Sequence, residues 1–296
     1  MQRSVLIVNP HASRVSPELT FAVERELRAA GPLETVLTER PLQAVALAET
    51  LSTRFETIYV FAGDGGYNEV VNGLARDVRL GFIPGGGTSV LPRALGVPRD
   101  PLAAARALAT SAAVRRISLG RVNARRFTFS AGLGLDAELV RRVDAAGREG
   151  GRRAGDLAFA RAFFGILAER RGRLEPSMEI VGLGRVASAL VANGDPYSFV
   201  GRLPLHVAPE ARFDQGLDLV APRELRARLL PQVAWWVAAG RGQQRSPHVL
   251  YLHDADEFRV VCEAPTPLQV DGEDLGDVTE ATFEAERDAL QVLVPR

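Results

Sequence analysis

The sequence predicts a mixed α/β protein with two domains, an α/β domain followed by a β-rich domain. Over the first 120 residues, short apolar runs alternate with segments of helical periodicity, which is typical of a parallel sheet with helices on both faces. From about residue 122 the runs become short and strand-like, and turns rich in Gly, Pro and Asp separate them, which favours a β-sandwich. We expect one domain over residues 1–121, joined by 287–296, and the other over 122–286.

The elements of the first domain follow from its apolar runs and their stops. The run 4–8 ends at Asn9-Pro10, and the helical pattern 18–30 ends at Gly31-Pro32. The expected strands, in order, are 4–8, 33–37, 57–61, 80–83 and a returning strand 289–294. The expected helices are 18–30, 41–54, 67–75, 89–94 and 101–109.

The second domain is predicted from short runs of apolar and β-branched residues. Its expected strands are 126–130, 178–181, 187–192, 203–207, 218–220, 258–262, 268–270 and 281–284. Two helical insertions, 137–171 and 223–240, interrupt these strands.

Composition excludes several classes of protein. The 296 residues are 46% hydrophobic and carry no net charge, so no global field favours nucleic acid. No apolar run reaches the roughly 20 residues that span a bilayer, and the apolar run at residues 5–8 is too short for the core of a signal peptide. Cys262 is the single cysteine, which excludes an intrachain disulfide. We expect a cytoplasmic protein, peripheral at the inner membrane face if it contacts lipid.

All 36 basic side chains are arginine, and this restricts the chemistry. Without lysine there is no Walker A lysine, no kinase strand lysine and no Schiff base. Any phosphate must therefore be bound by backbone N–H groups, arginine and metal.

A glycine-rich segment, residues 62–74 (AGDGGYNEVVNGL), follows the apolar run 58–61. Glycines let backbone N–H groups approach a ligand, and the positive end of the following helix favours an anion. Asp64, however, sits where a phosphate would lie. Two facing anions are compatible when Mg²⁺ lies between them, so the segment indicates a metal-nucleotide site.

A second glycine-rich loop, residues 84–88 (PGGGT), follows the expected strand 80–83. Its alternative interpretation is a tight turn from strand to helix. Ligands of parallel sheets bind beyond the carboxyl ends of the strands. Asn9, Asp64 and the loop 85–88 are all expected there, and this convergence favours a phosphate site.

Two further motifs leave alternatives open. The segment 267–274 (PLQVDGED) places Asp271, Glu273 and Asp274 on a tight turn, either solvated or holding a general base. The segment 131–137 (AGLGLDA) matches G-x-G-x-x-A, the dinucleotide fingerprint of an NAD(P)-dependent dehydrogenase, but it lies outside the first βαβ unit. The four histidines show no metal spacing, and we treat His11 as incidental.

Residues 141–173 hold nine arginines against four acids, with several Phe residues between them, and Trp235 and Trp236 lie on the other helical insertion. Either these helices pack on the core with a solvated basic face, or they dock on an anionic membrane.

Seven motifs in one order resemble the diacylglycerol kinase catalytic-domain family of soluble bacterial lipid kinases, which is related to sphingosine kinases and NAD kinases. These motifs are IVNP (7–10), AGDGGYNEVVNGL (62–74), PGGGTSVLPRALGVP (84–98), SLGRVN (118–123), FSAGLGLDAE (129–138), LVANG (190–194) and QVDGE (269–273). The resemblance implies a Rossmann-like N-terminal nucleotide domain, a C-terminal β-sandwich and a cleft between them. It also implies transfer of the ATP γ-phosphate to a lipid hydroxyl with Mg²⁺.

The resemblance assigns roles residue by residue. Glu273 is implied as the proton acceptor, and Asp64 as the catalytic acid that organises Mg²⁺. The implied nucleotide contacts are Asn9, Thr38, Gly63, Asp64, Gly65, Gly87 and Thr88. The stretch 213–218 resembles a metal-binding segment, which makes Asp214 a candidate ligand.

The chain departs from the family at several positions. Ala62 and Gly66 replace the Gly and Thr of GGDGT, and Gln215 replaces an Asp. Leu91 and Ser118 stand where many members carry acids or amides. These changes motivate a second hypothesis, a nucleotide- or lipid-binding protein with little kinase activity. The sequence does not show whether the lipid is diacylglycerol or a sphingoid base. It also leaves the oligomeric state open, a homodimer being one possibility.

Overall fold

The computed structural model describes residues 3–150 and 156–296. The chain divides into two compact units, Met1–Leu119 with Arg287–Arg296 and Gly120–Glu286.

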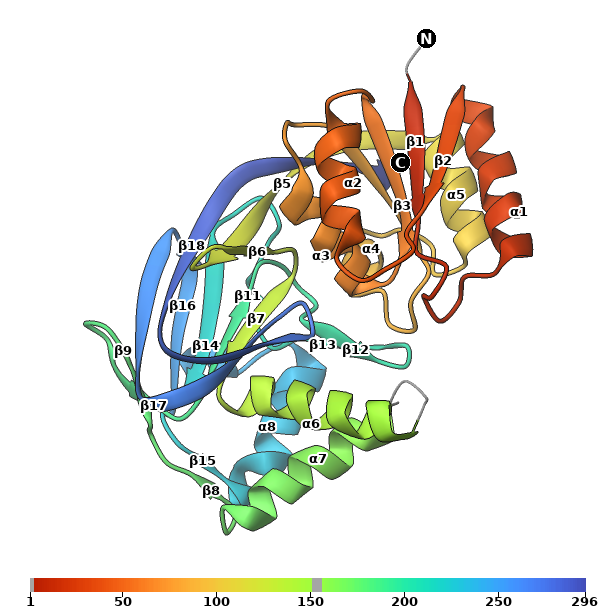
Figure 1. Ribbon diagram of the computed structural model, residues 1–296. Helices are drawn as coiled ribbons and strands as arrows, with labels where there is room; N and C mark the ends of the chain where they lie inside the picture. The colour runs from red at the N-terminus through yellow and green to blue at the C-terminus, as the bar shows by residue number, and fades with distance from the viewer. Residues whose placement is uncertain (1–2, 151–155) are drawn as a thin grey trace. The chain divides into compact units, whose positions relative to one another are not determined.

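The first unit is built on a parallel sheet with the strand order β2-β1-β3-β4-β18 (Figure 1). Its strands are β1 (Ser4–Val8), β2 (Leu33–Leu37), β3 (Thr57–Ala62), β4 (Arg79–Pro84) and the end of β18 (Glu273–Pro295). Every residue of β3 is buried, as expected for a central strand covered on both faces. Val8 lies opposite Leu37 and Phe61, and Ala62 lies opposite Pro84, so these strands end at one edge.

Helices cover both faces of this sheet (Figure 1). On one face α1 (Pro17–Leu27), followed by a 3₁₀ turn (Arg28–Ala30), packs against α5 (Pro101–Thr110); on the other α2 (Gln43–Ser52) packs against α3 (Asp64–Gly73). A short α4 (Val90–Ala94) follows β4. Ser16 and Asp100 start α1 and α5 by accepting hydrogen bonds from backbone N–H groups at 3.2 and 2.9 Å.

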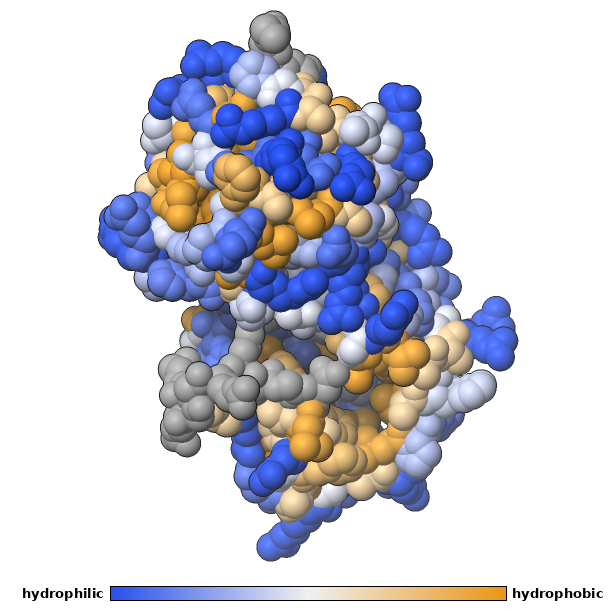
Figure 2. Space-filling view, turned by 90° about the vertical axis from the view of Figure 1, so that its right-hand side faces the viewer, coloured by the Kyte–Doolittle hydropathy of each residue, from blue (hydrophilic) through white to orange (hydrophobic). Residues whose placement is uncertain are grey.

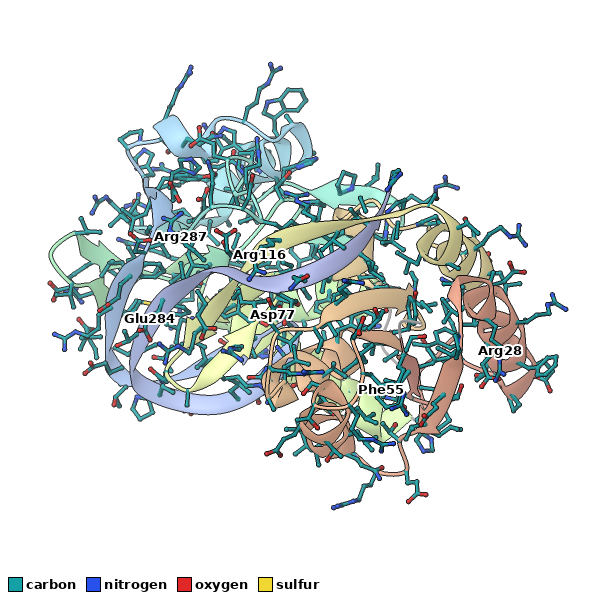
Figure 3. The ribbon with its side chains drawn as sticks, turned by 90° about the horizontal axis from the view of Figure 1, so that it is seen from above. Arg28, Phe55, Asp77, Arg116, Glu284 and Arg287 are labelled. Carbon is teal, nitrogen blue, oxygen red and sulfur yellow. The ribbon has the colours of Figure 1, made fainter. Side chains whose placement is uncertain are left out.

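The predicted return of the C-terminal strand is confirmed. Gln291 and Val292 of β18 pair in parallel with Arg79 and Leu80 of β4. Arg116, of β5 (Ala112–Val122), reaches Asp77 at 2.9 Å and the carbonyl oxygen of Asp288 at 3.0 Å (Figure 3). One guanidinium therefore ties the returning strand to the loop before β4.

The second unit is β-rich, as predicted. Its antiparallel strands follow the order β16-β14-β11-β7-β17-β18. Their bounds are β7 (Ser130–Leu133), β11 (Ala189–Ala192), β14 (Leu217–Pro222), β16 (Val249–Ala255) and β17 (Glu257–Val270), with β6 (Arg125–Phe127) paired to β5 and the hairpin β9 (Met178–Ile180)–β10 (Gly184–Val186) paired to β17.

These strands enclose one core. Phe258 stacks on Phe283 with ring centroids 5.1 Å apart, and Phe127 meets Phe283 edge-on at 6.5 Å. The predicted strands 258–262 and 268–270 form one long strand, β17, whose pairing with β18 shifts register between Val261 and Thr266. The sheet path is therefore continuous, and such irregularities let a strand bend around a core.

Three helices complete the second unit. The insertion predicted at 137–171 comprises α6 (Leu135–Gly150) and α7 (Asp156–Glu169), with residues 151–155 outside the described residues. The insertion predicted at 223–240 begins with β15 (Leu225–Arg226), which pairs with β8 (Arg173–Leu174), and a 3₁₀ turn (Ala227–Leu229) leads to α8 (Leu230–Ala239). A small hairpin, β12 (Ser198–Val200) and β13 (Leu203–Leu205), pairs only with itself among the described strands. None of the helices in the described ranges is long and apolar enough to cross a membrane.

Candidate active site

Four loops meet at the carboxyl edge of the parallel sheet, and backbone hydrogen bonds link them. The N–H of Thr38 donates to the carbonyl oxygen of Val8 at 2.9 Å, and that of Asn9 to the oxygen of Phe61 at 3.0 Å. The N–H of Gly85 donates to the oxygen of Ala62 at 2.7 Å. The structure thus brings together in the first unit all the sequence-predicted nucleotide contacts.

Asp64 opens α3, three residues earlier than the predicted start at 67. Gly63, with extended backbone, is the residue that precedes the helix. The Oδ1 atom of Asp64 accepts hydrogen bonds from the N–H of Val90 at 2.7 Å and of Leu91 at 3.4 Å. The carboxylate is therefore stabilised at the N-terminal ends of two helices at once, α3 and α4. This role of Asp64 in joining the two glycine-rich loops was not predicted.

The close packing of these loops depends on glycine. A Cβ on Gly86 would lie 2.9 Å from the Cα of Gly63, and a Cβ on Gly85 would lie 2.8 Å from the carbonyl oxygen of Ala62. Gly87 has no such contact, its nearest neighbour being the Oγ of Ser13 at 3.9 Å, and it is exposed together with Thr88. Gly85 and Gly86 thus serve packing, and Gly87 and Thr88 are the accessible part of the loop.

Ala62 and Gly66, two departures from the family pattern, are sterically coupled. A Cβ built on Gly66 would lie 2.6 Å from the Cβ of Ala62. Because the side chain of residue 62 occupies that space, residue 66 is limited to glycine. The methyl group that Ala62 adds thus fills the space that a side chain at residue 66 would need, so the two departures depend on each other.

We expect the variant Gly66→Thr to lose about 1–3 kcal/mol of stability through overpacking against Ala62. Ala62→Gly alone costs about 1 kcal/mol through backbone entropy. In the double variant the clash is gone, so its loss is smaller than the sum of the two. Urea unfolding of all four proteins measures the coupling, and strictly additive losses would contradict it.

Three arginines surround the loop 85–88, and sequence reasoning missed them. Arg99 and Arg93 donate to the carbonyl oxygens of Gly87 and Thr88 at 3.4 and 3.3 Å. Arg14 donates to the carbonyl oxygen of Arg99 at 2.9 Å. Since every cation of this chain is arginine, no local signal singled them out. They supply the positive charge that a lysine-free anion site needs.

A pocket of about 230 Å³ opens beside these loops in the first unit. Asn9 and Thr38, both predicted, line it together with His11, Arg40 and Glu69. Glu69 also accepts a hydrogen bond from the N–H of Ala44 at 3.2 Å, at the start of α2. His11, which no sequence motif singled out, therefore lies in the lining of this pocket. Position in the sequence could have indicated His11 and Arg40. Each lies two residues after a predicted nucleotide contact, Asn9 and Thr38 respectively.

The turn that carries Glu273 belongs to the second unit and is firmly anchored. Asp271 is buried, and its carboxylate accepts hydrogen bonds from the backbone N–H groups of Thr128, Phe129 and Ser130 at 2.7 to 3.2 Å. The N–H of Gly272 donates to the side chain of Gln269 at 2.9 Å. Of the three acids in this turn, Asp271 is therefore structural.

Glu273 and Asp274 differ in their partners. Glu273 is partly exposed and meets Arg125 at 3.3 Å. Asp274 forms a bidentate pair with Arg141 at 2.7 and 2.9 Å. Glu273 thus remains partly accessible while the backbone of its turn is fixed.

A buried polar cluster lies beneath the turn. Asp136 accepts hydrogen bonds from Tyr197 at 2.7 Å and from Gln269 at 2.6 Å, and Gln269 in turn holds Gly272. Burial raises the pKa of Asp136 above its ordinary value near 3.8. The residue retains some exposed surface, but its carboxyl group is enclosed by these partners.

The raised pKa of Asp136 predicts a pH effect on stability. Between the ordinary carboxyl pKa and the raised one, the folded state binds more protons than the unfolded state, so the contribution of Asp136 is present at low pH and is lost as pH rises through the folded pKa. We expect Asp136→Asn, which keeps one acceptor oxygen, to flatten the dependence of unfolding free energy on pH above about 4. Equal slopes for the two proteins in urea titrations would contradict this.

Asp214, the metal candidate, is exposed in the second unit. No three His, Cys, Asp or Glu side chains gather as a metal site within residues 3–150 and 156–296. The buried acid of this stretch is Asp218, which accepts hydrogen bonds from Tyr251 at 2.8 Å, the Nδ1 of His253 at 2.9 Å and the N–H of Asp254 at 3.0 Å. The role of Asp214 therefore stays a prediction.

Comparison with known proteins finds a match for the N-terminal part of the chain. Residues 3–122 match the family model described as the diacylglycerol kinase catalytic domain. This stretch of the chain is therefore similar to the catalytic domain of diacylglycerol kinases. The resemblance drawn from the ordered motifs is thereby confirmed for this part of the chain.

Three relatives place the catalytic domain among bacterial proteins. A diacylglycerol kinase of Bacillus subtilis is 36% identical over 146 residues, and a putative lipid kinase of Streptococcus pneumoniae is 30% identical over 151. These matches cover 47% and 49% of this chain but only 48% and 51% of the relatives, about half their length. A diacylglycerol kinase of Staphylococcus carnosus is 26% identical over all of this chain and 96% of its own length.

Solved structures extend the fold beyond the catalytic domain. A diacylglycerol kinase and a putative diacylglycerol kinase from Bacillus anthracis superpose with TM-scores of 0.74 and 0.77. They are 18% and 21% identical, and each match covers 99% of this chain and 97% of the other. The predicted two-domain α/β fold is confirmed.

Two further departures from the family lie in the interior. Leu91 in α4 and Ser118 in β5 are both fully buried. Unlike the exposed Thr88, they present no side chain on the surface of the catalytic domain.

The dinucleotide motif at 131–137 lies outside the catalytic domain and in the wrong surroundings. Its strand β7 pairs antiparallel with both β11 and β17, so no parallel βαβ unit surrounds it. A Cβ on Gly132 would lie 2.2 Å from the carboxyl oxygen of Asp136. An acid thus fills the space that a pyrophosphate would need.

Proposed function

We propose that this protein is an ATP-dependent lipid kinase that transfers the γ-phosphate to the hydroxyl of a diacylglycerol-like or sphingoid lipid. The observation that carries the proposal is the meeting of two glycine-rich loops, with Asp64 between them, at the carboxyl edge of a parallel sheet. The relatives named diacylglycerol kinase and putative lipid kinase support the choice of acceptor.

The nucleotide is assigned to the first unit. Asn9 and Thr38 line the pocket. Gly63 precedes α3, Gly65 lies in its first turn, and Gly87 and Thr88 belong to the second glycine-rich loop. Backbone N–H groups of the loops and the N-terminus of α3 bind phosphate oxygens. Arg14, Arg93 and Arg99 add positive charge around the second loop.

The residues present fit a magnesium ion. Mg²⁺ is usually bound in phosphotransferases by one or two carboxylates together with substrate phosphates, so Asp64 is a sufficient protein anchor. When bound, the ion neutralises phosphate charge. Asp64 then serves two purposes, since it also joins α3 to α4.

Glu273 is assigned as the proton acceptor for the lipid hydroxyl. Its turn is fixed by Asp271 and Gln269, and its carboxylate is oriented by Arg125. A positioned carboxylate that removes a hydroxyl proton is sufficient for this reaction, because phosphoryl transfer otherwise needs positioning and charge neutralisation.

The test is a phosphoryl-transfer assay with ATP and Mg²⁺ on a panel of diacylglycerol, sphingoid base and other lipid alcohols. We expect turnover on at least one, with the product phosphorylated at the acceptor hydroxyl. Absence of turnover on every lipid, in a protein that is folded and binds ATP, would overturn the kinase assignment.

One observation favours a second candidate, a nucleotide-binding protein with little kinase activity. Asp64 is already committed through Oδ1 to two backbone N–H groups of α4. A carboxylate held in this way has less freedom to follow a metal. Tight ATP binding with no lipid phosphorylation is the result expected of this candidate.

A further inference from the structure

The helix α8 is apolar except for Gln232 and yet has no fully buried residue. Its sequence, LPQVAWWVAA, carries no charge. Leu230 and Val233 pack against a small core cluster that they share with Phe163 of α7. Trp235, on another side of the helix, is 61% exposed. An apolar helix left uncovered in this way is costly in water and marks an interaction surface.

Two elements near α8 also carry exposed apolar side chains. On α7, Ile166 and Leu167 are buried, whereas Leu157 and Phe164, seven residues apart on one helical face, are 73% and 62% exposed. The β12–β13 hairpin is joined to α8 by a hydrogen bond from the N–H of His206 to the carbonyl oxygen of Val237 at 2.9 Å. We name as the docking face the exposed residues Leu157, Phe164, Val200, Leu203 and Trp235. Figure 2 shows hydrophobic residues gathering on this unit.

Three exposed arginines lie on or beside the same elements. Arg161 lies on the exposed face of α7 between Leu157 and Phe164, Arg202 lies at the tip of the hairpin, and Arg228 lies just before α8; all three are exposed. In the part of the chain that the structure describes, none of the three forms an ion pair. By contrast, two acids near these elements are paired with arginine, Glu169 with Arg142 and Glu224 with Arg226.

We propose that the docking face binds the surface of an anionic lipid bilayer. Aromatic and aliphatic side chains enter the interface between headgroups and acyl chains, where Trp is particularly favoured. The arginines extend their charged ends toward anionic headgroups, each contributing roughly fivefold in affinity. A second copy of this chain fits less well, because a two-fold contact would bring the unpaired arginines of both copies together.

The proposal rests on the proposed function only in its choice of lipid as partner, and it can be tested without catalysis. The probe is vesicle flotation, without nucleotide, with vesicles of phosphatidylglycerol and phosphatidylcholine or of phosphatidylcholine alone. We expect binding to the anionic vesicles, weakened at least roughly tenfold in F164Q/W235Q. We expect R161Q/R202Q to lose roughly tenfold or more on anionic vesicles and little on neutral ones.

Matched controls separate this face from general effects. F21Q removes an aromatic side chain of the other unit that is 68% exposed, and R185Q/R259Q removes the same charge from β10 and β17 of the same unit. We expect both to bind like the wild type. Turnover of a short-chain, water-soluble acceptor by F164Q/W235Q is expected to be unchanged, so failure of the kinase assignment would not affect the binding result.

Three outcomes would overturn the proposal. The first is a wild type that floats with neither kind of vesicle. The second is equal binding by F164Q/W235Q and the wild type. The third is a wild-type dimer in sedimentation velocity that F164Q/W235Q converts to monomer, which would make the face an interface between copies.

Discussion

Asp64→Asn is expected to lower kcat for lipid phosphorylation by roughly 10²- to 10³-fold while leaving the protein folded. The amide removes the charge that would hold Mg²⁺ beside the phosphates. Its oxygen can still accept the hydrogen bonds of Val90 and Leu91, now made at 2.7 and 3.4 Å, so the loops stay joined. The rate is measured with saturating ATP and lipid, and stability by urea unfolding.

Asp64→Ala separates the two roles of this side chain. It loses the capping acceptor as well as the charge, so we expect an additional loss of about 1 kcal/mol in stability relative to the amide. Asp100→Asn is the matched control, since Asp100 also accepts a backbone N–H bond at the start of a helix in the same unit, at 2.9 Å. A kcat of Asp64→Asn within threefold of the wild-type value would reject Asp64 as the carboxylate that organises Mg²⁺.

Glu273→Gln gives the second large effect, a fall in kcat of about 10²- to 10⁴-fold, because the amide cannot accept the proton of the lipid hydroxyl. Binding of ATP is expected to be unchanged. The turn stays in place because Asp271 and Gln269, not Glu273, fix its backbone.

Glu280→Gln is the control for this experiment. Glu280 lies on the same strand and also pairs with an arginine, Arg259 at 3.2 Å. We expect its turnover to match the wild type. A Glu273→Gln enzyme that retains the wild-type rate would exclude this residue as the base and leave the nucleotide assignments untouched.

Local patterns were sufficient to predict most of the first unit. The strands at 4–8 and 33–37 are reproduced residue for residue, because turn residues bound both short segments, Asn9-Pro10 after the first and Gly31-Pro32 before the second. The helix predicted at 67–75 begins instead at Asp64, since its first turn is stabilised by Gly63 and by contacts with a loop 26 residues away. Such contacts leave no periodic signal.

The second unit was less predictable. Runs 258–262 and 268–270 read as two strands because charged and proline residues separate them, yet they form one strand bent by an irregular register. The catalytic-domain motifs identified Asn9, Thr38 and the glycine loops, but not Arg14, Arg93 or Arg99, whose positions follow from packing. In a chain where every cation is arginine, composition cannot distinguish a site arginine from a surface one.

The sequence by itself determined which loops meet, because parallel strands direct their carboxyl ends to one edge of the sheet. It also determined that phosphate must be bound without lysine. Only the tertiary structure decided that Asp64 caps α4 and that Ala62 leaves room only for glycine at residue 66. It also decided that Asp271 supports the turn while Glu273 remains partly accessible. The physical reason is that these roles depend on distances of a few ångströms between residues far apart in the chain.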